Sequence, residues 1–498
     1  MLTRLKVSGF KNLVDVDVRF GPFTCIAGPN GTGKSNLFDA IRFLSALSDQ
    51  TFMDAAMSVR DEKGHSGDVR SLFHRVGDQY DNSMHFEAEM IVPENGVDDL
   101  GQETKASITF LRYILTLEYK TEIGIVTRGG LELKQEELHQ INLGDASDHL
   151  LFSHKSAWRK TAIKGRRTSP FISTEQNGVY IMRHQDGSKG RPLRHLASSL
   201  PRTVLSASNA AESPTSLMAR REMQSWKLLQ LEPSALRSPD SYKSPTHIGM
   251  DGSHLAATLY HLAHRGHIIS DSSITSSEIE GMIYGQVANS LSDLITDVHR
   301  VWVEPDPQRE LLTLYAVGKD GTPIPARSLS DGTLRFLALS VLELDPASTG
   351  LLCLEEPENG IHPTRIPAML RLLQRIAMDV SESIGPDNPL RQVIINTHSP
   401  AVVAQVPEQS LLIAELKPMV HNGQRFMRAG FACLPGTWRT KADEKPDEVP
   451  MGKLITYLNP INEETNVPKE IERTNHPNST RRVIDRSDVK QLILPHLE

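Results

Sequence analysis

The sequence predicts an α/β fold in which parallel and antiparallel sheets are joined by a mainly helical insertion. Short, wholly apolar runs at residues 351–354 and 393–395 are typical of parallel strands buried on both faces. Residues 1–20 instead alternate apolar and polar side chains, which indicates antiparallel strands with one face on a core. Between about 140 and 300 the pattern becomes helical and is broken by seven prolines, which excludes a long coiled coil.

These patterns divide the chain into four predicted parts. Residues 1–135 form an N-terminal lobe with the first strands, residues 136–300 a mainly helical insertion, and residues 301–434 a second α/β lobe. Residues 435–498 are rich in Pro, Asn, Glu and Lys and contain only brief apolar runs. Such a composition favours an extended tail that becomes ordered on a partner, so we expect a docking segment there.

Composition limits the class of protein further. The 498 residues include 54 Lys and Arg and 61 Asp and Glu, a net charge of −7, which argues against a wholly basic nucleic-acid binder. Residues 154–202 nevertheless hold eleven Lys and Arg against two acids. This stretch is either a solvated surface or a contact to the phosphate backbone of DNA, and both interpretations stay open.

The sequence also suggests where the protein resides. The three cysteines have no metal-like spacing and fall mostly in apolar runs, which is typical of reduced core residues. The first residues lack the apolar stretch of a secretory signal, and no apolar run is long enough for a membrane helix. We therefore expect a cytoplasmic protein without membrane contact.

Residues 28–35, Gly-Pro-Asn-Gly-Thr-Gly-Lys-Ser, match the phosphate-binding pattern G-x-x-x-x-G-K-[ST]. A strand-like run precedes the loop and a helical pattern follows it, as this motif requires. Lys34 is expected to reach the β and γ phosphates of a nucleotide, and Ser35 to offer its hydroxyl to Mg²⁺. The residues predicted to bind the nucleotide here are Asn30, Gly31, Gly33, Lys34, Ser35 and Asn36.

Two carboxylates end the apolar run 351–354. Glu355 is placed to hold the Mg²⁺ shell through water, and Glu356 to accept a proton from the attacking water. The alternative is a pair of acids that caps a surface strand. It leaves unexplained why four apolar residues lead directly into two charges.

Two further elements surround this acidic strand in sequence. Ser330 and Gly332 open a helical pattern, so the helix N-terminus there is a second candidate anion site, although alone it would be an ordinary cap. His398 ends the strand-like run 392–397, where an imidazole could sense the γ-phosphate or orient the attacking water. A single histidine at a strand end is more often structural.

In this order the four elements resemble the ABC-type ATPase head shared by RecF, SMC proteins and the OLD family. Residues 329–335 are similar to its signature, residues 355–363 to its acidic motif and residues 397–400 to its switch histidine. Residues 7–12 resemble the opening strand and adenine-side loop of that group. The intervening region resembles the OLD-like branch at Trp226, residues 236–239 and residues 251–255.

The resemblance implies ATP and Mg²⁺ as cofactors and a composite site. Two heads face each other, so that Ser330 and Gly332 of one contact the γ-phosphate held by Lys34 of the other. Hydrolysis at Glu356 then requires a dimer or a higher oligomer of this chain. ATP closes the assembly and its hydrolysis releases it.

The chain departs from the family pattern at three points. Glu355 replaces the usual Asp, and its longer side chain alters its reach to the metal shell. Asp331 replaces a small signature residue and brings a carboxylate near an anionic phosphate. The glutamine that usually binds Mg²⁺ has no clear counterpart, and Gln79 is the candidate.

No acid cluster of the Toprim nuclease kind follows the switch motif, so we expect no nuclease in this chain alone. The resemblance favours an ATPase subunit of bacterial antiphage defence, of the Septu or PARIS kind, which controls a separate nuclease effector. A RecF-like ATPase that binds DNA in repair or recombination is the alternative, and the basic stretch 154–202 supports it. A subunit that binds ATP without turnover is the third hypothesis.

Overall fold

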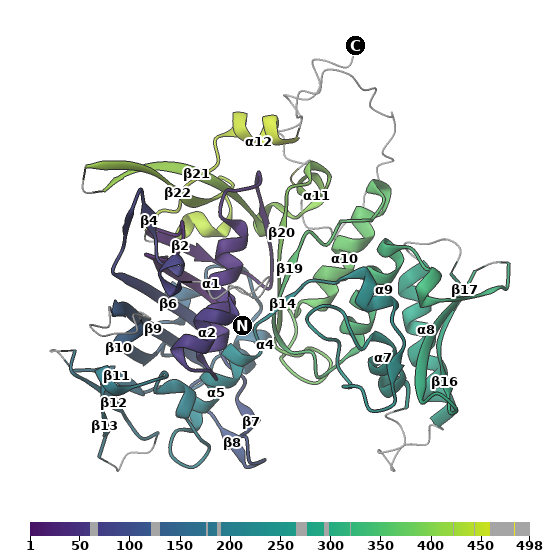
Figure 1. Ribbon diagram of the computed structural model, residues 1–498, viewed down its shortest axis with the longest axis horizontal. Coiled ribbons are helices and arrows are strands. Elements are labelled where there is room, and N and C mark those ends of the chain that lie inside the picture. Colours follow the sequence, from purple (N-terminus) through teal and green to yellow (C-terminus); the bar gives the residue numbers. More distant parts are fainter. Residues whose placement is uncertain are drawn as a thin grey trace.

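The computed structural model describes residues 1–59, 68–120, 130–175, 178–186, 191–264, 276–292, 298–318, 320–421, 423–442, 444–458 and 483. Figure 1 shows two lobes, with a large sheet on one side, helices α7–α10 on the other, and β14, β19 and β20 between them. The prediction of an α/β fold with mixed parallel and antiparallel sheets is confirmed.

The first lobe is built on an eight-stranded sheet whose neighbouring strands are all antiparallel. In spatial order its strands are β13 (Leu193–Leu196), β12 (Tyr180–Arg183), β11 (Ile172–Thr174), β10 (Gly130–Gln140), β9 (Phe110–Lys120), β6 (Ser83–Ile91), β1 (Leu2–Ser8) and β2 (Val16–Arg19). From Leu5 onward in β1, and along β2, apolar and polar side chains alternate, which places the apolar ones on the face toward helix α1 (Lys34–Leu47).

A six-stranded sheet joins the two lobes. Its order is β14 (Lys227–Leu229), β19 (Gly350–Glu355), β20 (Arg391–Thr397), β3 (Phe23–Ala27), β21 (Leu411–His421) and β22 (Gln424–Cys433). All neighbours are parallel except β21 and β22. Strand β3 is buried along its whole length, with Ile26 in the core around α1 and Cys25 in the core on the opposite face. Both faces of this sheet are therefore covered, which explains its continuous apolar runs.

A third sheet contains β15 (Asp240–Ser241), β17 (Leu311–Val317), β16 (Arg300–Asp306) and β18 (Pro323–Pro325). In one hairpin β4 (Arg75–Val76) pairs with β5 (Gln79–Tyr80), and in another β7 (Asn95–Val97) pairs with β8 (Glu103–Lys105). The remaining helices are α2 (Phe52–Ser58), α3 (Ala146–His149), α4 (Ser156–Ala162), α5 (Pro214–Gln224), α6 (Pro233–Arg237), α7 (Leu255–His264), α8 (Ser276–Ser292), α9 (Asp331–Leu344), α10 (Ile366–Ile376), α11 (Pro400–Gln405) and α12 (Met451–Leu458). No helix of the described residues is long and apolar enough to cross a membrane.

Residues 136–300 contain helices α3–α8, and they also contain short strands that join the neighbouring sheets. Strands β11–β13 extend the eight-stranded sheet, β14 joins the six-stranded sheet, and helices α7 and α8 pack against each other. The three added strands are three or four residues long, with few buried positions. Strands of this kind at a sheet edge show little alternation, so the sequence pattern missed them. The four-part division of the chain stays a prediction.

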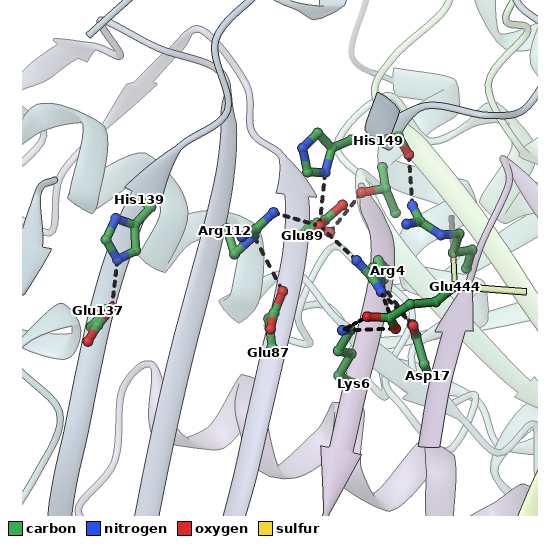
Figure 2. A network of polar contacts seen from close by, with 12 residues as sticks. Arg4, Lys6, Asp17, Glu87, Glu89, Arg112, Glu137, His139, His149 and Glu444 are labelled. Atoms are coloured by element: carbon green, nitrogen blue, oxygen red, sulfur yellow. Dashed lines mark hydrogen bonds and ion pairs between the residues drawn. The ribbon is translucent and has the colours of Figure 1, made fainter. Parts of the chain in front are cut away.

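The outer face of the eight-stranded sheet holds a network of charges, which Figure 2 shows. Its centre is Glu89, whose side chain is fully buried and whose Oε1 lies 3.0 Å from His149 Nδ1, 3.3 Å from Arg112 Nη2 and 3.5 Å from Arg4 Nη1. Arg4 also donates from Nε to Asp17 Oδ1 over 2.8 Å. Burial acts to raise the pKa of Glu89, but His149 and the two arginines outweigh it and lower the pKa. The carboxylate is therefore ionised and paired at neutral pH.

Candidate nucleotide site

The predicted phosphate loop connects β3 to α1 at the centre of the six-stranded sheet. Gly33 has φ of +101°, a conformation that L side chains rarely adopt. At Gly28 an added Cβ would lie 2.4 Å from the carbonyl oxygen of Ala414 on β21. The glycines thus let the loop turn closely over the neighbouring strand, and helix α1 begins directly at Lys34.

Lys34 is buried beneath this loop. Its Nζ donates to the carbonyl oxygens of Gly28, at 2.5 Å, and Pro29, at 2.8 Å. Burial lowers the pKa of the ammonium, while the nearby carboxylates oppose this effect. The ammonium is thus held against the loop, where a bound phosphate would exchange these carbonyl contacts for its own oxygens.

A cavity of about 480 Å³ brings the predicted site residues together. It is lined by all six predicted residues of the loop and its helix, by both carboxylates at the end of β19, and by residues of the segment after β14 and of α9. The other lining residues are Leu229, Gln230, Leu231, Glu232, Arg335, Leu339, Leu354, Pro357, Asn359 and Asn396. Residues far apart in sequence therefore form one pocket, although their individual roles stay predictions.

Glu356 is held from several sides. Its N–H donates to the backbone oxygen of Asn396 at 3.0 Å and lies 3.1 Å from Oδ1 of the same residue. Asn359 Nδ2 donates to Oε2 at 2.9 Å, and His398 Nδ1 lies 2.5 Å from Oε1. Burial acts to raise the pKa of Glu356, but the contacts with Asn359 and His398 outweigh it and lower the pKa. The result is an ionised, oriented carboxylate, the form that a general base needs.

The backbone conformation of Glu356 also favours a functional role for this residue. Its φ is +45°, in the left-handed region that costs free energy for any residue with a side chain. Such conformations persist where the surroundings hold them, and they concentrate at functional sites. The backbone oxygen and Oδ1 of Asn396, which both lie at the Glu356 N–H, supply that restraint.

The donor set around Ser35 and Glu355 fits Mg²⁺. Both residues line the cavity, and Glu355 Oε1 accepts a hydrogen bond from Asn396 Nδ2 at 3.2 Å. Hydroxyl, carboxylate and amide oxygens are hard ligands, and Mg²⁺ at phosphates keeps several waters besides one or two protein carboxylates. Ser35 and Glu355 are thus suited to hold the ion beside a bound phosphate.

Sequence reasoning missed Gln230. Gln79, the predicted glutamine, lies exposed in the β4–β5 hairpin and does not line the cavity, whereas Gln230 does. Gln230 follows β14, and β14 pairs in parallel with β19, so the glutamine comes beside the carboxylates that end β19. The available signal was the apolar pair of residues 228–229 between Trp226 and Pro233, which is too short to indicate a strand by periodicity.

Ser330, Asp331 and Gly332 of the signature lie outside this cavity. Ser330 is exposed and caps α9, accepting a hydrogen bond from the N–H of Thr333 at 3.2 Å. Gly332 packs under Gly360, since an added Cβ would lie 2.3 Å from its carbonyl oxygen. Asp331 forms an ion pair with Arg237, so its charge is compensated within the chain. One turn further along α9, Arg335 reaches the cavity and donates to the Asn359 carbonyl oxygen.

The basic stretch 154–202 is partly neutralised. Ion pairs join Lys164 to Glu94, Arg167 to Asp186, Arg183 to Glu212 and Arg194 to Glu175. Lys189 lies outside the described residues, whereas Lys155, Lys160, Arg166, Arg191 and Arg202 are exposed. The tail expected over residues 435–498 also lies largely outside them, and its described part includes α12 and the buried Val483.

Two family models match the chain. One, described as AAA domain, putative AbiEii toxin, Type IV TA system, covers residues 184–404 and so includes the signature, the acidic strand and His398. The other, described as RecF/RecN/SMC N terminal domain, covers residues 1–96 with the phosphate loop.

Curated relatives match over short segments. An OLD nuclease of Thermus scotoductus is 51% identical over 41 residues, 8% of this chain and 8% of that protein. The DNA replication and repair protein RecF of Magnetococcus marinus is 49% identical over 45 residues (9% and 12%), and that of Phocaeicola vulgatus 35% over 63 residues (12% and 17%). The chain thus matches less than a fifth of the length of each relative.

Solved structures of Smc heads align over most of the chain at low identity. An SmcHead bound to the C-winged helix domain of ScpA is 14% identical, with 86% of this chain and 97% of that chain covered and a TM-score of 0.41. An Smc head domain in a complex derived from Pyrococcus furiosus is 10% identical, with coverages of 87% and 96% and a TM-score of 0.41.

Proposed function

We propose that this chain, an ATPase of the superfamily that includes SMC, RecF and OLD proteins, hydrolyses ATP at a site that two copies complete together. The observation that carries the proposal is that Lys34, Ser35 and Glu356 line one cavity of the chain. Lys34 would bind the β and γ phosphates, and Ser35 and Glu355 would hold Mg²⁺, with Gln230 as a further oxygen donor. Mg²⁺ neutralises charge on the phosphates when it is bound.

In the proposed reaction Glu356 accepts the proton of the attacking water. His398 holds this carboxylate by its Nδ1, and its imidazole is half exposed. Asn359 fixes the other carboxylate oxygen, so the base has one orientation. Positioning and charge stabilisation supply most of the catalysis of phosphoryl transfer, and these contacts provide both.

The position of Ser330 supports a site shared between two copies. The serine and the exposed N-terminus of α9 do not line their own chain's cavity, and the helix N-terminus carries positive dipole charge suited to a phosphate. Since Arg237 compensates Asp331, the acid in the signature does not repel such an anion strongly. The γ-phosphate in the partner's cavity is the anion that this end of α9 would contact.

Ser330→Arg is expected to lower ATP turnover by about 10²-fold, because the bulky cation displaces the signature donors from the partner's phosphate. ATP binding to the single chain should persist, since Lys34 is untouched. For wild type, and for the control Ser383→Arg at an exposed position, turnover per chain should rise with protein concentration. Turnover independent of concentration, or normal turnover in Ser330→Arg, would contradict the shared site.

The finer role we propose is control of a separate nuclease effector in antiphage defence. The segment shared with an OLD nuclease and the family description that names a toxin support it, although each concerns only part of the chain. Bacteria that carry this gene with its neighbouring genes should resist phage, and Glu356→Gln should abolish the resistance. Plaque counts would measure it, and resistance in cells that express this chain alone would contradict the need for an effector.

A RecF-like role on DNA is the second candidate, and the two RecF matches favour it. The basic stretch gives it less support than its charge suggests, because at least four of its cations pair with acids of the same chain. Cations paired in this way release fewer counterions on binding DNA.

A further inference from the structure

A third carboxyl group of the acidic segment belongs to Glu358, which is buried. The residue is 7% exposed, and one of its oxygens accepts a hydrogen bond from the Thr397 hydroxyl. The oxygen of the same hydroxyl accepts from the N–H of Ser399 at 2.9 Å. Glu358, Thr397 and Ser399 therefore form a continuous chain that joins the acidic segment to the turn that contains His398.

This chain runs parallel to the contact between Glu356 and His398. Glu358 lies two residues after Glu356, and Thr397 and Ser399 flank His398 on both sides. Besides the bonds from Asn396 to Glu355 and Glu356, the same two segments are thus joined through the exposed catalytic pair and through a buried hydrogen-bond chain. Of these two contacts, the buried hydrogen-bond chain is shielded from water and is better suited to fix the distance between the segments.

The surroundings of the Glu358 carboxyl group are also unfavourable. Its second oxygen, Oε2, is buried without a hydrogen-bond partner among the described residues, and so is the hydroxyl of Tyr457 on α12. Burial raises the pKa of Glu358, and the charge of Glu356 adds to this effect. A buried carboxyl with an unsatisfied oxygen destabilises the fold, so its presence here calls for a functional reason.

We propose that Glu358 is a positioning residue for ATP hydrolysis, which acts through Thr397 to keep His398 against Glu356. The inference rests on the proposed ATPase function. Glu358 does not line the cavity, and the backbone bond from Gly28 N–H to the Thr397 carbonyl oxygen, 3.2 Å long, does not depend on either side chain. Loss of Glu358 therefore affects the orientation of the base and leaves the phosphate loop in place.

The test compares Glu358→Ala, Thr397→Val, the double variant and Glu358→Gln. Each of the first two should lower kcat about 10-fold, since small misplacements of a catalytic group have effects of this size or more. KM for ATP should stay within about twofold. The double variant should be no slower than the slower single variant, because both changes break one interaction. Glu358→Gln should recover most of the rate, because its amide oxygen still accepts from Thr397.

All rates are expressed per ATP-binding site, measured by equilibrium binding of ATP, so that unfolded protein is not counted. The exposed Glu382→Ala variant is the control. A normal kcat per site in Glu358→Ala, or additive losses in the double variant, would overturn the inference. If wild type does not hydrolyse ATP, or if Glu356→Gln is as fast as wild type, the proposed function fails instead.

Discussion

Glu356→Gln is expected to lower the rate of ATP hydrolysis by about 10²- to 10⁴-fold, the contribution typical of a general base. The amide keeps the size of the side chain but has no basic oxygen to accept the proton. ATP binding should remain near wild type, because Lys34 and Ser35 are unchanged. Uncleaved ATP should also keep the closed assembly populated, so the mass in solution with ATP should be that of a dimer or larger.

Turnover by phosphate release and mass by light scattering check both parts of this prediction. Glu382→Gln, the same chemical change at an exposed position, should behave as wild type in both measurements. Normal hydrolysis in Glu356→Gln would remove the role given to this residue. A slow variant that remains monomeric with ATP would keep the base and contradict the proposed assembly.

Glu89→Gln is expected to destabilise the protein by about 3 to 5 kcal/mol at neutral pH, the usual cost of removing one partner from a buried ion pair. The side chain is fully buried in the network of Figure 2, and its loss leaves Arg4, Arg112 and His149 without their shared carboxylate. Free energies of unfolding from urea denaturation would measure the effect, with Glu382→Gln as the exposed control.

The stability difference between wild type and Glu89→Gln should be smaller at acid pH than at neutral pH. Because the pKa of Glu89 is lowered in the folded protein, its contribution is fully present above its unfolded pKa, about 4.3. The contribution is lost as the pH falls from there through the lowered folded value. The stability difference between wild type and Glu89→Gln should therefore narrow under acid, and a difference that is unchanged or wider there would contradict the pairing.

The sequence predicted those parts of the site whose chemistry requires neighbours in the chain. The phosphate loop and Glu355 with Glu356 are contiguous motifs, so their residue types reveal them directly. Gln230 was missed because its place depends on the pairing of the three-residue strand β14 with β19. Nor does the sequence distinguish the buried Glu358 from an exposed acid, since its burial and its hydrogen bond to Thr397 depend on the fold.

Strand β3 also has a consequence for the order in which the protein is made. It is hydrogen-bonded on one side to β20 and on the other to β21, whose residues are synthesised several hundred positions later. During translation the phosphate loop therefore follows a strand with two unpaired edges, which is a site of aggregation until both partners arrive. On the ribosome the nucleotide pocket can form only after β20 and β21 have been synthesised, so we expect ATP binding by a nascent chain to report that the central sheet is closed.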